Sequence, residues 1–273
     1  MDNGDRLSPN KNASAATATL LASNSPTGAG PTVFATRPNV PPVTPFRLTV
    51  AIPVYNERET LREIVDRVRA VPVDKEIILV DDGSTDGTRD LLRDIESRYP
   101  DVRVVYHERN QGKGAAIVTA IRYATGDYLI VQDADLEYDP MAYLELLPAL
   151  TDNRADVVYG SRFKGSIQGM QFANLLANRI LTIAANLLFP GARLTDEATC
   201  YKMFRLSVLK SLPLRARRFD FCPEVTAKVL KRGYRIHEVP IHYTARSVSQ
   251  GKKIRWTDGV DALWALIRYK FRD

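Results

Sequence analysis

The sequence has few of the residues that build metal–thiolate sites, disulfide scaffolds or histidine-based catalytic centres. Its 273 residues include two cysteines, Cys200 and Cys222, and three histidines, His107, His237 and His242. The cysteines lack metal-ligand spacing and are too few for a disulfide framework, and the histidines form no metal or triad pattern. We therefore predict reduced thiols, structural histidines and a cytoplasmic protein.

Long apolar runs are also missing. A membrane-spanning helix needs about 20 consecutive apolar residues, and the nearest candidate, residues 172–189, is interrupted by three asparagines and an arginine. The apolar stretch near residues 19–22 is too short and too rich in serine and threonine for a secretory signal. We expect a protein that neither crosses a membrane nor carries such a signal.

The charge balance is mildly basic. Lys and Arg number 38 against 32 Asp and Glu, which gives a net charge of +6. A basic balance suits an anionic partner such as a nucleotide, a phospholipid surface or a nucleic acid, although a solvated surface with spare lysines explains it equally well. Because no nucleic-acid-binding motif with interleaved aromatic residues is present, we do not expect nucleic acid as a partner.

The first part of the chain has a regular pattern after a low-complexity start. Residues 1–45 are rich in Ser, Ala, Thr, Pro, Gly and Asn, a composition that predicts a disordered tail. From residue 46 onward, short apolar runs alternate with segments of helical periodicity. We predict strands at residues 46–52, 76–80, 102–106, 128–132 and 155–160, and helices at 58–71, 85–99 and 112–125. This alternation predicts a mostly parallel sheet that helices cover on both faces.

The second part of the chain is less regular. The pattern predicts an amphipathic helix at residues 171–188, a short helix after Phe204, a helix at 223–232, a strand at 233–243 and a basic loop at 246–253. An aromatic-rich amphipathic helix ends the chain. We divide the protein into a tail (1–45), a catalytic domain (46–255) and a C-terminal helix (256–273).

Polar residues gather where three predicted strands end. Residues 55–57 follow the first strand, Asp82 follows the second, and Asp133 and Asp135 follow the fourth. In parallel sheets, ligands bind beyond the carboxyl ends of the strands. Two carboxylates two residues apart can reach one cation, and their oxygens suit Mg²⁺ or Mn²⁺. Taken alone, the acidic pair more often marks a solvated turn, but its position after an apolar strand favours a metal site, to which Glu137 could contribute as a third ligand.

Two further segments near this edge have a structural alternative. The segment Asp81-Asp82-Gly83-Ser84 consists of residues that favour turns. We therefore expect one of its acids to cap the turn and the other to bind a ligand. Gly112-Lys113-Gly114 opens a helix but lacks the flanking pattern of a P-loop. We expect this second segment to serve tight turn packing.

Four motifs occur in the same order as in family 2 glycosyltransferases. They are Ile52-Pro53-Val54-Tyr55-Asn56-Glu57, the segment from Val80-Asp81-Asp82-Gly83 to Thr88, Asp133-Ala134-Asp135-Leu136 and Gly160-Ser161-Arg162-Phe163. Over residues 47–255 the chain resembles this family, and most of all its dolichyl- and polyprenyl-phosphate hexosyltransferases. The resemblance implies an α/β GT-A fold, in which a Rossmann-like, mostly parallel sheet flanked by helices forms a single catalytic domain.

The resemblance also assigns the donor site. It implies that a nucleotide sugar is bound by Pro53, Tyr55, Glu57, Val80, Asp82, Asp133, Ala134, Asp135, Arg162, Arg246 and Lys252. The first five of these would hold the base and ribose. Asp133 and Asp135 would bind Mg²⁺ or Mn²⁺ under the diphosphate, with Glu137 where relatives often have Gln. Arg246 and Lys252 match a pair in a mobile basic loop that closes over the phosphates.

In the acceptor half, the resemblance points to Asp196 as base or acceptor-positioning residue, beside Asp135 as the second catalytic acid. The alternative role of Asp196 is that of a loop acid paired with Arg193 or Lys202. Ala198 replaces a glutamate that relatives of this subtype often have. Glu224 is a second candidate base, and it equally suits the first turn of a helix.

Together these features predict an inverting, metal-dependent hexosyltransferase of class EC 2.4.1. The donor would be GDP-mannose or UDP-glucose and the acceptor a polyprenyl or dolichyl phosphate; the alternative is a soluble acceptor, such as a glycan or a secondary metabolite. The amphipathic helices at residues 171–188 and 256–271 suit peripheral contact with the inner face of the membrane. Their alternative is packing on the domain or in a homo-oligomer.

Overall fold

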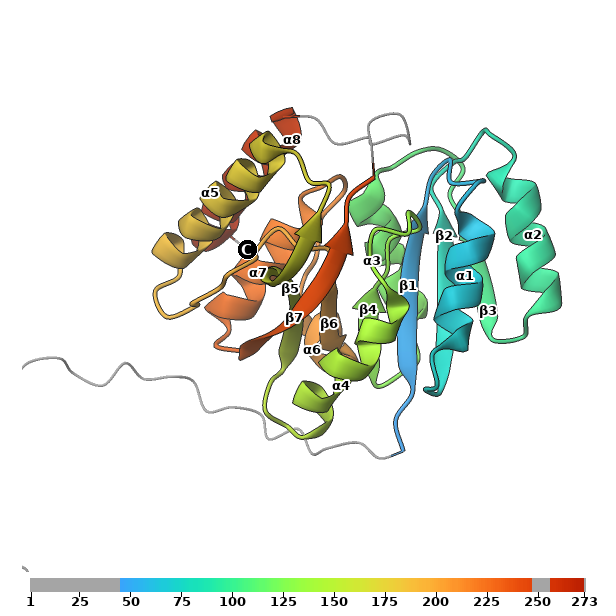
Figure 1. Ribbon diagram of the computed structural model, residues 1–273, viewed down its shortest axis with the longest axis horizontal. Coiled ribbons are helices and arrows are strands. Elements are labelled where there is room, and N and C mark those ends of the chain that lie inside the picture. The colour runs from blue at the N-terminus through green and yellow to red at the C-terminus, as the bar shows by residue number, and fades with distance from the viewer. Residues whose placement is uncertain (1–44, 247–255, 273) are drawn as a thin grey trace, which may run out of the picture. The chain divides into compact units, whose positions relative to one another are not determined.

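The short apolar runs form the strands of one sheet (Figure 1). The computed structural model describes residues 45–246 and 256–272, all of which belong to the compact unit Ala35–Asp273. The strands lie in the order β3-β2-β1-β4-β6-β5-β7. Their bounds are β1 Leu48–Val54, β2 Lys75–Asp81, β3 Val102–Tyr106, β4 Tyr128–Val131, β5 Val157–Gln168, β6 Lys202–Arg205 and β7 Ile236–Thr244.

The sheet is mostly parallel, as predicted. Strand β1 pairs in parallel with both β2 and β4, β2 pairs in parallel with β3, and β5 pairs in parallel with β7. Only β6 among the paired strands of the described chain runs antiparallel to its neighbours, β4 and β5. The five strands expected from the first part of the chain are all present.

Helices cover both faces of the sheet. Their bounds are α1 Leu61–Ala70, α2 Thr88–Arg98, α3 Lys113–Tyr123, the 3₁₀ turn Pro140–Ala142, α4 Tyr143–Thr151, α5 Phe172–Leu188, α6 Leu206–Ser211, α7 Phe221–Lys231 and α8 Trp256–Phe271. Apolar residues of α1, α2 and α4 join one core cluster, and those of α3, α5, α6, α7 and α8 join the other.

Alternation along the strands sorts side chains between these two cores. In β2, Ile77 and Leu79 enter the core under α1 and α2, whereas Ile78 and Val80 enter the core under α3. Successive side chains of a strand point to opposite faces, so continuous apolar runs are required where both faces are covered. In α1, the residues at helical spacing are fully buried, and each such side chain contributes about 1.5–3 kcal/mol relative to exposure.

The second part of the chain differs from the prediction in three elements. Strand β6 was not predicted, because its sequence Lys-Met-Phe-Arg begins and ends with charged residues although all four side chains are buried. Strand β5 continues to Gln168, well beyond the predicted end at residue 160, through polar positions that pair with β7. Helix α4 was also missed; Pro148 lies inside it and weakens its helical pattern.

The C-terminal helix begins and ends where predicted and contacts α5 and α7. Within the described ranges, no helix is long and apolar enough to cross a bilayer. The predicted tail, apart from Pro45, and most of the predicted basic loop, including Lys252, lie outside the described residues. The division into three segments therefore stays a prediction.

Candidate active site

The site lies where the strand order reverses. Strand β1 has β2 on one side and β4 on the other, so the connections from β1 and β4 diverge. In open sheets of this kind, the ligand crevice lies beyond the carboxyl ends of the strands at such a reversal. Glu57 follows β1 and Asp135 follows β4. One side chain, that of Arg246 after β7, reaches both of them. The prediction that these polar segments meet at one edge of the sheet is confirmed.

Arg246 joins three carboxylates of the crevice. Its Nη1 lies 3.2 Å from Glu57 Oε2, its Nη2 lies 3.0 Å from Asp135 Oδ2, and its Nε lies 4.0 Å from Glu137 Oε1. The backbone N–H of Arg246 also donates to Glu137 Oε1 at 2.8 Å. Glu137 is further held by the Tyr243 hydroxyl, which donates to it at 2.6 Å. The arginine thus supplies positive charge among acids that a cation would otherwise neutralise.

The surroundings of Asp135 disfavour the charged form of its carboxyl group. Burial, followed by the negative charges of Asp133 and Glu137, raises its pKa to about 7, although Arg246 and Lys113 act in the opposite direction. A carboxylate that must share a buried site with other acids is stabilised by a cation. Strongly perturbed acids of this kind occur preferentially at functional sites.

Asp133 has its own cationic partner. Lys113 Nζ lies 2.6 Å from Asp133 Oδ1, and it also donates to the sulfur of Cys200 at 3.2 Å. Although burial lowers it, the charge of Asp133 raises the pKa of Lys113 well above its ordinary value. From the sequence alone, Gly112-Lys113-Gly114 at the start of a helix is only a weak signal for phosphate binding, because it lacks the phosphate-loop pattern.

The glycines of that motif serve tight packing, as predicted. Gly112 has a φ of +98°, and a Cβ there would lie 2.4 Å from the carbonyl oxygen of Arg217. A Cβ on Gly114 would lie 2.9 Å from the carbonyl oxygen of Arg218. Close contact between the start of α3 and the loop before α7 therefore requires glycine, and it fixes the direction in which Lys113 points.

The acidic pair fits a hard divalent cation by chemistry. Asp133 and Asp135 offer carboxylate oxygens, and Mg²⁺ typically takes one or two protein carboxylates and completes its shell with water and phosphate. Among residues 45–246 and 256–272, no group of three or more Asp, Glu, His or Cys side chains is arranged to hold a metal ion. The third contribution from Glu137 stays a prediction, because its oxygens accept bonds from Tyr243 and Arg246.

The predicted base and ribose residues line the neighbouring strand ends. Tyr55 is 36% exposed directly after β1, whereas Val80 is fully buried within β2. The two loops are tied together: the Asn56 N–H donates to Ser84 Oγ at 3.0 Å, and the Thr85 N–H donates to Asn56 Oδ1 at 2.8 Å. The contacts of Pro53, Tyr55, Glu57, Val80, Ala134 and Asp82 with a nucleotide stay predictions.

The two acids at the end of β2, Asp81 in its last position and Asp82 directly after it, have different partners. Asp81 accepts the N–H groups of Gly83 and Ser84 and is ion-paired to Arg89 at 2.7 Å, so it is the acid that caps the turn. Asp82 accepts the N–H groups of Gln111 at 2.8 Å and Gly112 at 2.7 Å. Its Oδ1 also lies 2.8 Å from His107 Nδ1. Asp82 thus holds the loop that precedes α3, and His107 has the structural role predicted for it.

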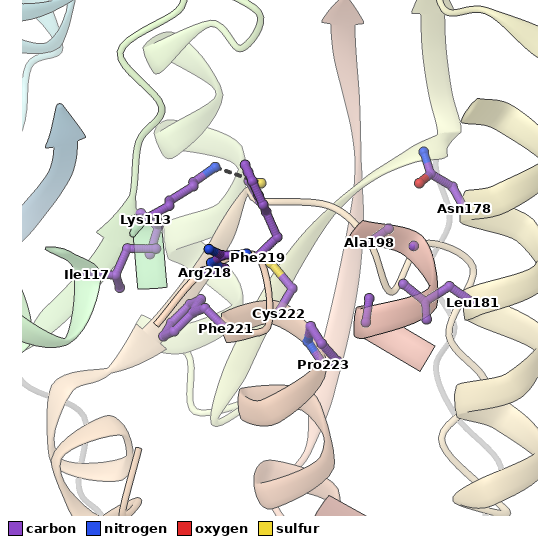
Figure 2. A pocket seen from close by; sticks show the side chains of 14 residues that line it. Lys113, Ile117, Asn178, Leu181, Ala198, Arg218, Phe219, Phe221, Cys222 and Pro223 are labelled. Atoms are coloured by element: carbon purple, nitrogen blue, oxygen red, sulfur yellow. Dashed lines mark hydrogen bonds between the residues drawn. The ribbon is translucent and has the colours of Figure 1, made fainter. Parts of the chain in front are cut away.

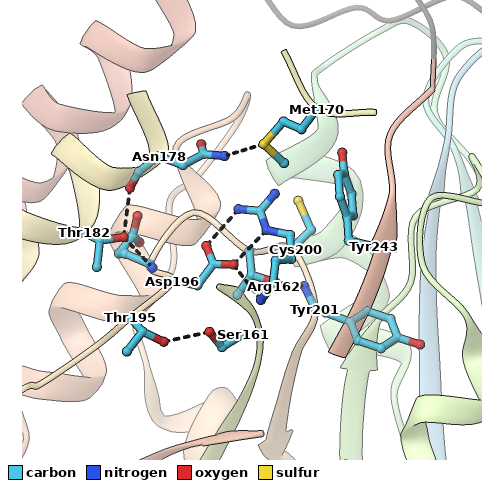
Figure 3. Close-up of polar contacts among 12 residues, drawn as sticks. Ser161, Arg162, Met170, Asn178, Thr182, Thr195, Asp196, Cys200, Tyr201 and Tyr243 are labelled. Atoms are coloured by element: carbon cyan, nitrogen blue, oxygen red, sulfur yellow. Dashed lines mark hydrogen bonds and ion pairs between the residues drawn. The ribbon is translucent and has the colours of Figure 1, made fainter. Parts of the chain in front are cut away.

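Asp196 and Arg162 form a buried pair (Figure 3). Arg162 donates from Nε to Oδ2 at 2.7 Å and from Nη2 to Oδ1 at 2.8 Å, and its backbone N–H donates to Oδ2 at 3.0 Å. Asp196 is fully buried and Arg162 is 5% exposed. Asp196 therefore has Arg162 as its partner, and the alternative partners Arg193 and Lys202 are wrong. With both oxygens engaged, this geometry favours positioning over proton abstraction.

Two glutamates of the second part of the chain are also buried. Glu224 accepts the backbone N–H groups of Arg215 and Ala216 and is ion-paired with Lys228 at 2.7 Å, which makes it a structural acid rather than a free base. Glu238, which was not considered from the sequence, accepts the backbone N–H groups of Thr195 and Asp196. It therefore holds the loop that carries Asp196 against β7.

A family model for Glycosyl transferase family 2 matches residues 49–212. The chain belongs to this family. The match covers the ends of β1, β2 and β4, including the acidic pair after β4, and the Arg162–Asp196 pair, but it ends before β7 and Arg246. The predicted resemblance, the GT-A-like fold and the assignment as a transferase are confirmed.

Three curated relatives are polyprenol-linked mannosyltransferases. The chain is 31% identical to the undecaprenyl-phosphate mannosyltransferase of Micrococcus luteus, over 76% of this chain and 87% of that protein. It is 31% identical to the polyprenol monophosphomannose synthase of Mycolicibacterium smegmatis, over 76% and 80%. It is 28% identical to the dolichol-phosphate mannosyltransferase of Pyrococcus furiosus over 76% of this chain, but it spans only 59% of that protein.

Solved structures of glucosyl-3-phosphoglycerate synthase share this fold. Glucosyl-3-phosphoglycerate synthase from Mycobacterium tuberculosis, in complex with Mn²⁺, uridine diphosphate and phosphoglyceric acid, matches with a TM-score of 0.65 and 20% identity, over 84% of this chain and 80% of that one. The same enzyme with Mg²⁺ and uridine diphosphate also gives 0.65 and 20%, over 84% and 81%. At this identity, the likeness shows the fold.

Proposed function

We propose that this family 2 glycosyltransferase transfers a hexose, with inversion, from a nucleotide-diphosphate sugar to the phosphate of a polyprenyl phosphate. The observation that carries the proposal is the crevice at the β1–β4 reversal, where Asp133 and Asp135 lie beside Lys113 and Arg246. Acids and cations set side by side suit a metal–diphosphate group, whose metal needs carboxylates and whose phosphates need positive charge.

The residues of the chain would act by binding and charge compensation. Bound Mg²⁺ or Mn²⁺ at Asp133 and Asp135 would supply Lewis-acid stabilisation of the departing diphosphate. Arg246, which contacts Asp135 at 3.0 Å, would move its guanidinium to the phosphates when the cation neutralises that acid. Lys113 adds a second positive charge on the other side of Asp133. Preorganised charges aimed at the developing charge of the leaving group are usually the largest contribution to catalysis.

An acceptor phosphate makes a general base unnecessary. A phosphate monoester is already anionic near neutral pH, so its oxygen can attack the anomeric carbon without losing a proton to the protein. The paired state of Asp196 supports this choice of acceptor, because both of its oxygens already accept bonds from Arg162. Asp196 and Arg162 would instead shape the acceptor side of the crevice.

An exposed apolar stripe on α5 supports a lipid acceptor and contact with a membrane surface. Five apolar side chains recur at helical spacing with exposed fractions between 50% and 79%: Phe172, Leu176, Ile180, Ile183 and Leu187. Helix α8 contacts α5 and adds exposed Val260, Trp264 and Phe271. Arg268, Lys270 and Arg272 provide positive charge near the end of α8, which suits anionic lipid headgroups. The cytoplasmic location and any homo-oligomer stay predictions.

A donor and acceptor screen tests the function. The purified chain is incubated with Mn²⁺, a panel of radiolabelled nucleotide hexoses and undecaprenyl phosphate in detergent, and the products are extracted with organic solvent. We expect label in the organic phase with one donor, and its loss with EDTA. The second candidate is a soluble phosphorylated acceptor, favoured by the fold shared with glucosyl-3-phosphoglycerate synthase. Label that enters only aqueous products with phosphoglyceric acid would replace the lipid proposal.

A further inference from the structure

A cavity of about 130 Å³ lies beside the start of α3, where Lys113 lines it (Figure 2). Its walls come from α3, the end of β4, α5, the segment before and into α7, and α8. Apolar groups make up most of its surface, among them Leu181, Phe219, Phe221 and Ala262. One side chain joins the cavity to the donor crevice: Lys113 lines the cavity, and its Nζ is ion-paired with Asp133.

Only two charged side chains line this cavity within the described part of the chain, and both are cationic. Lys113 lies on the side of the acidic pair, and Arg218 lies in the loop before α7. Arg218 is exposed, and its guanidinium has no ion-pair partner among the residues that the structure describes. We call the side of the cavity that Lys113 and Arg218 line its mouth. An anionic group there could contact both side chains, while the apolar remainder of the cavity suits only an apolar group.

The volume sets the size of that apolar group. An apolar protein cavity of about 150 Å³ stays dry and binds benzene. A cavity of about 130 Å³ accordingly holds a branched five-carbon unit, and the rest of a longer chain would lie outside it. A glycerate backbone would instead place its hydroxyl and carboxylate against Phe219 and Phe221, at the cost of burying polar groups without partners.

We propose that this cavity binds the isoprene unit next to the acceptor phosphate, with Lys113 and Arg218 holding the phosphate at its mouth. The inference rests on the proposed transfer to a polyprenyl phosphate and deepens it by naming where the acceptor lies. The acceptor phosphate would then contact Lys113, whose Nζ is ion-paired with Asp133. Helix α5 lines the cavity with Leu181 and carries the exposed apolar stripe on its outer side, so the remaining isoprene units would lie near that helix.

Both cysteines of the chain line this cavity, so thiol chemistry can report its occupancy. The hydrogen-bonding interaction with Cys200 lowers the pKa of Cys222 to about 6, and the charges of Lys202 and Lys113 act in the same direction. A thiol of low pKa reacts readily near neutral pH. No other thiol contributes background.

The test is protection from N-ethylmaleimide, followed by mass spectrometry of the full chain at neutral pH. Citronellyl phosphate, a short isoprenoid phosphate, is compared with inorganic phosphate and with glycerol 3-phosphate at equal concentrations. We expect citronellyl phosphate to slow modification by about tenfold, as for a site at least nine-tenths occupied, and the other two to have little effect. Equal protection by inorganic phosphate, or none by citronellyl phosphate, would overturn the assignment.

Two variants locate the effect. Ala262→Phe should fill the cavity and remove the protection, while Arg218→Ala should weaken it several-fold through the exposed mouth. Arg215→Ala is the matched control in the same loop, because that residue does not line the cavity. Unchanged protection in both Ala262→Phe and Arg218→Ala would overturn the proposal, and unchanged binding of nucleotide diphosphate shows that the variants are folded.

The outcome separates this proposal from the function on which it rests. Protection needs neither donor nor turnover. If citronellyl phosphate protects the thiols but no sugar reaches any polyprenyl phosphate, the proposed function fails and the cavity assignment stands. If sugar reaches polyprenyl phosphate without any protection, the cavity assignment fails and the function stands.

Discussion

The guanidinium of Arg246 lies 3.0 Å from the carboxylate of Asp135, at the point where a metal–diphosphate group is proposed to bind. The same arginine bonds Glu57, so it bridges the loops after β1 and β4. A divalent cation at the proposed site would therefore compete with this guanidinium for one acid. The competition would link metal binding to the position of the Arg246 side chain.

Arg246→Ala should tighten the binding of Mn²⁺ in the absence of nucleotide while lowering transfer. Removing a charged hydrogen bond to Asp135 frees that carboxylate, an effect on the order of 1.5 kcal/mol or about tenfold in affinity. Titration followed by the electron paramagnetic resonance of free Mn²⁺ measures it. Arg98→Ala, which removes an exposed pair with Asp94, is the control. Weaker Mn²⁺ binding in Arg246→Ala would contradict the competition.

Asp135→Asn should abolish metal-dependent transfer, by about 100-fold or more, because an amide is a poor ligand for a hard cation. The folded state should not be destabilised, since burial and two neighbouring acids already disfavour the charge on Asp135. The two measurements are initial rate at saturating Mn²⁺ and the thermal midpoint. Asp152→Asn, at an exposed position, controls for loss of surface charge. Transfer at the wild-type rate would remove Asp135 from the metal site.

Asp196→Asn should lower the stability of the protein without changing the pH midpoints of transfer, as expected for the loss of a positioning residue. Arg162 would be left buried without its counter-charge, which typically costs about 3 kcal/mol in the free energy of unfolding. The pH dependence of the remaining transfer should keep its midpoints, because no base has been removed. Urea unfolding and a pH–rate profile test the two expectations. Loss of the acidic limb of the profile would identify Asp196 as the base instead.

Much of the first half of the fold could be predicted because β1, β2 and β4 contain apolar runs that are buried on both faces. Each run from β1 to β4 is bounded by turn residues, and the helices between them have apolar residues on one stripe. Strand β6 could not be predicted, since Lys202 and Arg205 are buried there through contacts that only the tertiary structure supplies. Lys202 donates to the carbonyls of Glu197 and Thr199, and Arg205 donates to that of Leu150.

Some residues of the candidate site could likewise be predicted from the sequence, and others could not. Asp133, Asp135 and Glu57 lie at strand ends, so parallel topology alone brings them to one edge. Lys113 and Glu238 were missed because their roles depend on partners 20 and more than 40 residues away. The pairing of Asp196 with Arg162 likewise depends on the contact of a loop with β5, which no local pattern encodes.

Glu197→Gln should flatten the pH dependence of stability. Neither oxygen of this fully buried carboxylate has a hydrogen-bond partner in the described part of the chain, and burial raises its pKa from 4.5 to about 7 although Lys202 opposes this. An acid with a raised pKa contributes stability that is present at low pH and lost as pH rises through the folded value. The wild type should therefore lose on the order of 3 kcal/mol between pH 5 and pH 8 through this group.

Urea unfolding of the wild type and Glu197→Gln at several pH values between 5 and 8 measures that difference. The variant should be more stable relative to the wild type at pH 8 than at pH 5. Glu145→Gln, at an exposed position on α4, should follow the wild type. Parallel profiles for wild type and Glu197→Gln would mean that Glu197 does not titrate in this range.

Ile180→Glu together with Ile183→Glu should weaken binding to anionic lipid vesicles. Both side chains are more than half exposed on the apolar stripe of α5, so the substitutions should leave the folded state largely intact while placing two negative charges against the bilayer. Co-sedimentation with vesicles that contain phosphatidylglycerol, at low and high salt, measures binding. Leu144→Glu on α4, an exposed apolar residue on the opposite face of the sheet, is the matched control. If the double variant and the control bind vesicles as the wild type does, the α5 stripe is not the membrane-facing surface, and packing against another protein becomes the better explanation of its exposure.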